Sequence, residues 1–160
     1  MVNKSMNAIE LYPLGKIKDR IKTMFLNDED ICTLLVNKND PETAALHDNL
    51  FISETQSDVR TYIVMDTFVS NCESLKIKEV QTTIQVFTHN TLIALPNGEM
   101  PKYQAKGYFG NRIDILCDAI ARCLNGSLEF GIGSMQLVQR SPIRLIQPNS
   151  NYYGTFEVSI

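Results

Sequence analysis

Residues 76–88 read KIKEVQTTIQVFT, and this stretch decides the fold. Two sets of side chains alternate along it: Val80, Thr82, Ile84 and Val86 in one set, Glu79, Gln81, Thr83 and Gln85 in the other. Because successive side chains of a strand point to opposite faces of its sheet, the alternation predicts a strand with a core face and a polar face. The polar face is mainly uncharged Gln and Thr, which can be solvated or can pair with a neighbouring subunit without burying charge.

The segments upstream of this strand predict another strand and two helices. Residues 60–69 (RTYIVMDTFV) are rich in β-branched and aromatic residues, which predicts a strand apolar on both faces and near the middle of a sheet. Apolar residues recur at helical spacing between 13 and 26, as in an amphipathic helix. Asn27 and the acids at 28–30 supply a capping residue and first-turn charges for a short second helix.

The downstream half predicts one more helix and three strands. Residues 111–126 (NRIDILCDAIARCLNG) carry an apolar stripe, with Asn111 as the cap, Asp114 in the first turn and Gly126 at the stop. Strands are expected at 133–140, at 143–147 and, after a turn at 148–151, in the final YYGTFEVSI. We therefore predict one α+β domain over 1–160, with a mostly antiparallel sheet and helices packed on one face.

Two long connections interrupt these elements. The segment 39–58 is acidic, with Asp40, Glu42, Asp48, Glu54 and Asp58, and reads as a solvated loop or as a docking surface for a basic partner. The segment 89–106 contains the turn signal Pro96-Asn97-Gly98 and is expected to form a hairpin arm or a flexible loop.

The composition excludes several classes of protein. A net charge of -3 lacks the basic surface that nucleic-acid binders carry, so no sequence-specific nucleic-acid partner is expected. The amino terminus shows no apolar run typical of a signal peptide or membrane anchor, which predicts a soluble protein that stays inside the cell. Cys32, Cys72, Cys117 and Cys123 have no metal-ligand spacing and read as reduced core cysteines.

No pattern of catalytic residues is present. His47 and His89 both fall in predicted loops, where a surface role is the simpler interpretation. Asp114 and Asp118 are four positions apart on the predicted helix but have no third residue spaced to complete a metal or acid–base site. Arg140 and Arg144 can bind an anion but are explained as charges around a strand bend. We therefore expect no enzyme activity, no cofactor and no metal.

The order of elements resembles that of tail-terminator and tail-completion proteins, which cap the tail tube of long-tailed bacteriophages. Four segments carry the resemblance: GKIKDRIKTMF (15–25), IKEVQTTIQVF (77–87), NRIDILCDAIARCLNG (111–126) and LVQRSPIRLIQPNSNYYGTFEVSI (137–160). The acidic segment 39–58 has no clear counterpart in that family.

The resemblance implies a structural virion protein, made in the host cytoplasm and incorporated at the tail or neck. Its expected partners are copies of itself in a hexameric ring, the tail tube protein and the neck or head connector protein. Candidate interface residues follow from the polar strand and the connection after it: Gln81, Thr83, Gln85, His89, Asn97 and Lys102. A head-closure or neck adaptor, and a small ligand-binding or regulatory domain, are the alternatives.

Overall fold

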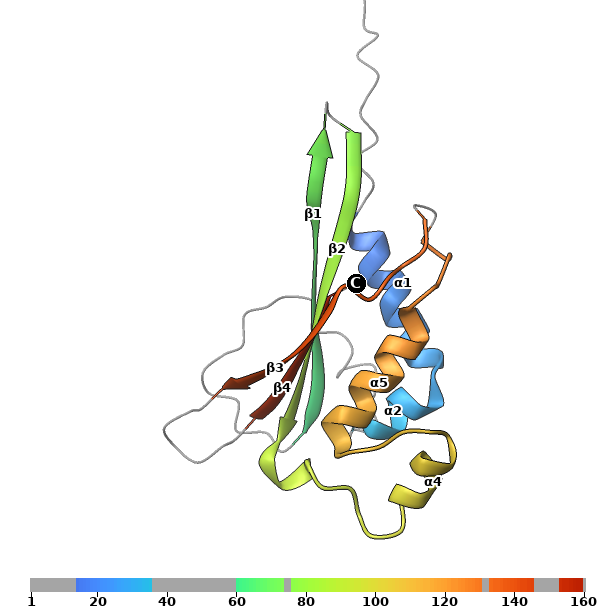
Figure 1. The fold of residues 1–160 in the computed structure, drawn as a ribbon, viewed down its shortest axis with the longest axis vertical. Coiled ribbons are helices and arrows are strands. Elements are labelled where there is room, and N and C mark those ends of the chain that lie inside the picture. The colour runs from blue at the N-terminus through green and yellow to red at the C-terminus, as the bar shows by residue number, and fades with distance from the viewer. Residues whose placement is uncertain (1–13, 36–59, 74–75, 131–132, 146–152, 160) are drawn as a thin grey trace, which may run out of the picture.

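The computed structural model describes residues 14–35, 60–73, 76–130, 133–145 and 153–159. Its helices and strands follow in the order α1 (Leu14–Asn27), α2 (Glu29–Leu34), β1 (Thr61–Glu73), β2 (Lys76–His89), the 3-10 turn η1 (Asn90–Leu92), α4 (Met100–Ala105), α5 (Arg112–Leu124), β3 (Gln139–Leu145) and β4 (Tyr153–Ser159). Figure 1 shows α1, α2 and α5 on the same side of the sheet. The α+β class, with helices packed on one face of an antiparallel sheet, is confirmed.

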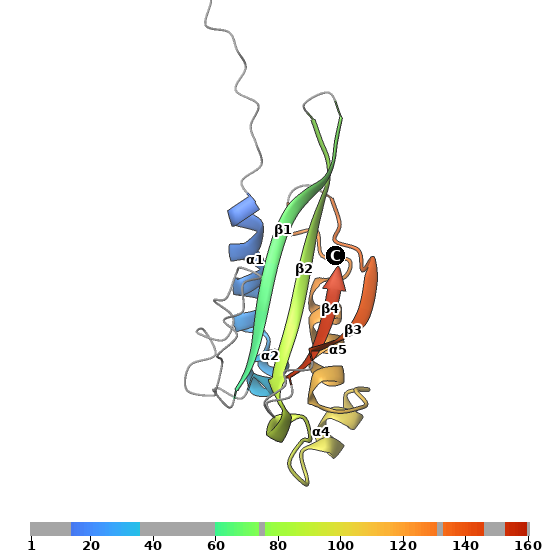
Figure 2. The same ribbon diagram turned by 90° about the vertical axis from the view of Figure 1, so that its left-hand side faces the viewer.

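The sheet has the strand order β1-β2-β4-β3, and every neighbouring pair is antiparallel. β1 and β2 pair along almost their whole length, from Thr61 opposite Thr88 to Glu73 opposite Lys76. β4 pairs only with the part of β2 from Thr83 to His89. The remainder of β1 and β2 therefore projects beyond α1 as a two-stranded ribbon, which Figures 1 and 2 show at the top of the molecule.

The prediction that β1 lies near the middle of the sheet is wrong, because among the described strands β1 lies at the edge. Its apolar character on both faces is nevertheless real over its first half. Ile63 and Met65 have no exposed surface, and Tyr62 and Val64, which alternate with them, are 1% and 2% exposed. Burial of both faces therefore identified the core correctly but gave no information about the position of the strand in the sheet.

The helix-covered face of the sheet matches the alternation in the sequence. Ile84 and Val86 are fully buried, and they lie opposite Met65 and Ile63 in the β1–β2 register. Ile17, Ile21 and Phe25 of α1 add the facing stripe of the core. Burying each such side chain stabilises the fold by about 1.5–3 kcal/mol.

Local capping fixes the ends of the helices. Asp28, rather than Asn27, caps α2, since its carboxylate accepts a hydrogen bond from the Ile31 amide at 3.0 Å. Asn111 caps α5 as predicted, and Asp114 completes a capping box by accepting from the Asn111 amide at 2.9 Å. None of the described helices has both the length and the apolar character that crossing a bilayer requires.

The segment 89–106 is neither a hairpin arm nor a flexible loop. It contains η1 and α4, the latter with Pro101 in its first turn, where the missing proline N–H costs no hydrogen bond. The Tyr108 amide donates to the Tyr103 carbonyl at 2.9 Å, just after α4. The Arg112 amide donates to the Ile93 carbonyl at 3.0 Å, which ties the segment to the start of α5.

The carboxyl-terminal strands also differ from expectation. One strand, Gln139–Leu145, replaces the two predicted over 133–140 and 143–147, and Arg140 and Arg144 both belong to its continuous pairing with β4. Pro142 is tolerated inside it because β3 is an edge strand, whose proline need not donate to a second neighbour. The final strand, Tyr153–Ser159, lies between β2 and β3, while the acidic segment 39–58, the turn at 148–151 and His47 fall outside the described residues.

Two glycines permit a matched test of the helix ends. Gly126 follows α5 with φ of 83°, a left-handed conformation, whereas Gly15 lies in α1, and an added Cβ meets nothing within 4 Å at either site. We expect Gly126→Ala to lower the free energy of unfolding by about 1 kcal/mol through backbone strain alone. Gly15→Ala should raise it by about 0.5 kcal/mol. Urea denaturation measures both, and equal signs for the two changes would contradict this account.

Candidate functional site

The structure places the six predicted interface residues in three different environments. Gln81, Thr83 and Gln85 lie on the face of β2 away from the helices. Asn97 and Lys102 are exposed in the connection and helix between β2 and α5, at the opposite end of the molecule from the ribbon. His89 lies between the two groups at the end of β2. The six therefore form no single surface.

The β1–β2 register adds two residues that the sequence did not indicate as interface candidates. Phe68 lies opposite Gln81, and Asp66 lies opposite Thr83. Phe68 is 41% exposed although it is a large apolar residue. We name the five residues Asp66, Phe68, Gln81, Thr83 and Gln85 the open face. Only knowledge of the pairing between β1 and β2 could have found its β1 half.

The open face is bounded toward the body of the domain by an aromatic pair. Tyr62 and Phe87 are cross-strand partners whose rings stack in parallel, with centroids 5.0 Å apart and planes at 8°. Both residues are 1% exposed. Along the same sheet face, side chains change from buried aromatics near His89 to the half-buried Gln81 and Gln85 and the exposed Phe68 at the base of the ribbon, while Thr83 stays buried.

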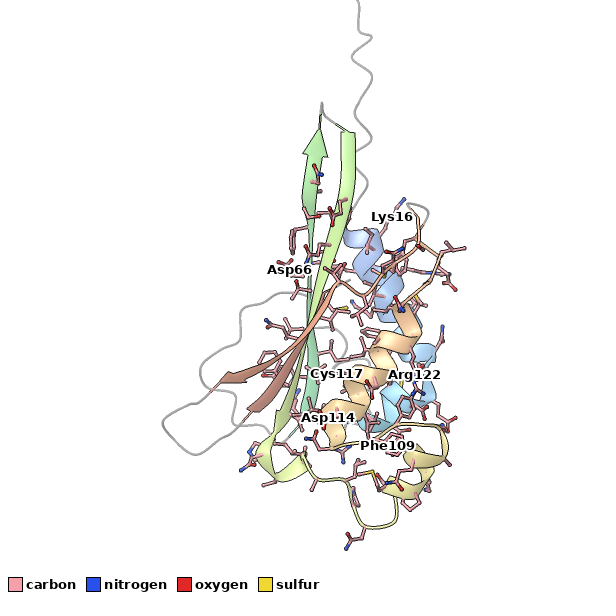
Figure 3. All side chains as sticks on the ribbon, in the orientation of Figure 1. Lys16, Asp66, Phe109, Asp114, Cys117 and Arg122 are labelled. Atoms are coloured by element: carbon pink, nitrogen blue, oxygen red, sulfur yellow. The ribbon has the colours of Figure 1, made fainter. Side chains whose placement is uncertain are left out.

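Asp66 makes two contacts at the outer edge of β1. Its Oδ1 accepts a hydrogen bond from the Thr67 amide at 2.9 Å, and the same oxygen lies 3.7 Å from Lys18 Nζ of α1. Figure 3 labels Asp66 on the β1 side of the sheet. Behind it, on the helix-covered face, the hydroxyl groups of Thr67 and Thr82 are hydrogen-bonded at 3.1 Å. The carboxylate is therefore held at the point where the ribbon leaves the body.

His89 is not the surface loop residue that its sequence position suggested. It is 8% exposed, ends β2, and caps η1 through its Nδ1, which accepts from the Thr91 amide at 3.3 Å. The same nitrogen lies 2.8 Å from the Thr91 hydroxyl oxygen. These contacts fix the turn that follows β2 and so position the residues after it.

A buried guanidinium anchors the connection that carries Asn97 and Lys102. Arg112 is 5% exposed, and it donates from Nε to the Leu92 carbonyl at 2.6 Å and from Nη1 to the Leu34 carbonyl at 3.1 Å. Burial lowers the pKa of this group from its ordinary value. Arg112 joins η1, the end of α2 and the start of α5, which holds this end of the molecule in one arrangement.

Asp114, which was considered for an acid–base or metal site, has a structural role. Asp114 belongs to the capping box of α5, and among the described residues no cluster of His, Cys, Asp and Glu could hold a metal ion. Burial raises the pKa of the Cys123 thiol to about 11 and also raises that of Cys32. Because the thiolate is the nucleophilic form, these two cysteines are poor nucleophiles near neutral pH.

Arg112 and Arg122 provide a second matched test. Both donate to two backbone carbonyls, but Arg122 does so at the surface, to the carbonyls of Lys106 and Gly107, each at 2.9 Å. We expect Arg112→Met to lower the free energy of unfolding by about 2–3 kcal/mol, because charged hydrogen bonds are lost in a buried site. Arg122→Met should cost about 1 kcal/mol or less. If urea denaturation gave equal losses of unfolding free energy for the two variants, burial of Arg112 would not explain its contribution to stability.

One comparison with known proteins gives a result. The model of the YomW family matches residues 28–157, from the cap of α2 into β4. No curated protein and no solved structure matches the chain. The family match includes β1, β2, α4, α5 and β3, and so covers both the open face and the connection held by Arg112. The chain therefore belongs to the YomW family and is a phage-related protein.

Proposed function

We propose that the protein is a structural subunit of the virion that forms a ring, caps the tail tube and joins it to the neck or head connector. The observation that carries the proposal is the open face, where the exposed aromatic Phe68 lies among the uncharged Gln81, Thr83 and Gln85. Apart from the Asp66 carboxylate, which lies 3.7 Å from Lys18 Nζ, this surface can be buried against protein with little desolvation of charge. Membership of a phage-related family supports an assembly role of this kind.

The candidate residues fall into two separate groups, which gives the subunit surfaces for two kinds of contact. A ring needs head-to-tail contacts, in which each subunit uses two different surfaces. The open face lies at the base of the ribbon, and Asn97 and Lys102 lie at the other end of the molecule. In a ring the open face would contact a different surface of the neighbouring subunit, which leaves Asn97 and Lys102 for the tail tube or the connector. In this proposal the protein has no catalytic site and no cofactor.

The alternatives remain a head-closure or neck adaptor, and a small ligand-binding or regulatory domain. An adaptor would use the same open face but occupy another position in the particle. A ligand-binding domain would be stabilised by its ligand, so a ligand-dependent rise in melting temperature would favour it.

The proposal predicts that the purified protein assembles through its open face. Light scattering after size-exclusion chromatography should give a mass several times that of the 18.1 kDa chain. The double change Gln81→Glu and Gln85→Glu should weaken the assembly at least about tenfold, because it places two charges in a desolvated contact. Far-UV circular dichroism should stay unchanged, since both side chains are partly exposed in the subunit.

A matched double change at the other exposed group, Asn97→Glu and Lys102→Glu, is the control. It should leave the mass of the assembly unchanged if that group contacts the tube or connector. Electron microscopy of particles labelled with an antibody against the protein should place it at the junction of tail and neck. A strict monomer that is absent from particles would refute the proposal.

A further inference from the structure

We propose that Asp66 is an edge guard, which keeps the outer edge of β1 closed to strand addition by a second copy of the chain. The inference concerns the isolated subunit and does not depend on the function proposed above. It rests on the direction of backbone groups along β1, on the contacts of Asp66 and on the sequence of the edge itself.

The hydrogen bonds of the hairpin define which backbone groups point outward. The His89 amide donates to the Arg60 carbonyl at 3.1 Å, so these two residues form a hydrogen-bonded pair. Bonded and non-bonded pairs alternate along an antiparallel ladder. Ile63, Met65, Thr67 and Val69 of β1 therefore belong to non-bonded pairs with β2, and their N–H and C=O groups point away from it. Among the described strands, β1 has no neighbour on that side.

The hydrogen bond between Asp66 and the Thr67 amide agrees with the outward direction of that amide. It also occupies one backbone donor at the outer edge of β1. The Thr67 amide, which should point outward, donates to the Asp66 carboxylate at 2.9 Å. A strand arriving at this edge would find the Thr67 donor already engaged and a carboxylate in its path. Lys18, whose Nζ lies 3.7 Å from the same carboxylate oxygen, holds the guard from α1. Charged side chains at sheet edges are a common protection against unwanted pairing.

The sequence around Thr67 suits pairing with a second copy if the guard is removed. In an antiparallel arrangement about a two-fold axis at Thr67, Thr67 lies opposite the same residue of the other copy, and Met65 lies opposite Val69. Threonine pairs and pairs of apolar residues stabilise neighbouring strands. Within Thr61–Val69, Asp66 is the only charged residue. Asp66 thus lies beside the two-fold axis, opposite Phe68 of the other copy, in a stretch that is otherwise uncharged.

A second feature limits the edge toward the tip of the ribbon. The register shifts between Val69 and Asn71, which places one extra residue in β1 at that point. Such a bulge twists the edge and interrupts a regular ladder. The regular part of the edge therefore ends at Val69, and Asp66 guards the last portion of it.

The test compares Asp66→Ala with Asp19→Ala, which removes the same charge from an exposed position of α1. Sedimentation velocity over a range of concentrations should show Asp66→Ala associating beyond the wild-type assembly, with Asp19→Ala unchanged. Asp66→Asn keeps an oxygen that can accept from the Thr67 amide, so it should associate less than Asp66→Ala. Far-UV circular dichroism checks that all three variants keep their fold.

Amide hydrogen exchange supplies a readout that does not depend on association. At a concentration where Asp66→Ala is still dispersed as the wild type is, the Thr67 amide should exchange about tenfold faster in this variant, because its hydrogen-bond acceptor is gone. An unchanged Thr67 rate, or equal association of Asp66→Ala and Asp19→Ala, would overturn the proposal. A wild-type protein that is monomeric would count against the ring but leave this comparison intact.

Discussion

The pairing register between β1 and β2 is the constraint on which the rest of the structure depends. Placing Ile63 opposite Val86 and Met65 opposite Ile84 directs both pairs to the helices. Moving β2 by a single residue would exchange its two faces and bring Gln85 into the core in place of Ile84 and Val86. The same register places Phe68 opposite Gln81 and turns the Thr67 amide outward. The buried core, the open face and the outer edge of β1 therefore all follow from the pairing of β1 with β2.

The two ends of this hairpin are stabilised in different ways. Near His89, both sheet faces are buried, β4 pairs with β2, and Tyr62 stacks on Phe87. Beyond Thr83, the ribbon has no further described strand beside it, and two strands alone are marginally stable in water. The ribbon therefore depends on its own cross-strand contacts, of which the buried bond between Thr67 and Thr82 lies at its base. A partner that packs on the ribbon would add stability where the subunit has least.

Local sequence signals predicted the local structure well, and long-range features poorly. The cap at Asn111, the acid at 114 and the stop at Gly126 depend on neighbours within four residues, and α5 was found from them. The alternation of apolar and polar residues in β2 likewise predicted which face of the strand is buried. The edge position of β1 was missed because burial on both faces is typical of central strands, whereas here it belongs to an edge strand. His89 was misplaced because nothing local indicates that β2 continues to it.

The candidate site was only partly accessible from sequence for the same reason. Gln81, Thr83 and Gln85 follow from a period of two along one strand, but Asp66 and Phe68 join them only through pairing across the hairpin. Arg112 reads as an ordinary polar position at the start of a helix, and its role depends on carbonyls of α2 and η1 that are distant in the chain. A subunit that must assemble at one surface must also avoid pairing at another. In the proposed assembly the two requirements would meet two positions apart on one strand, because Phe68 leaves apolar surface exposed while Asp66 engages the outward amide of Thr67.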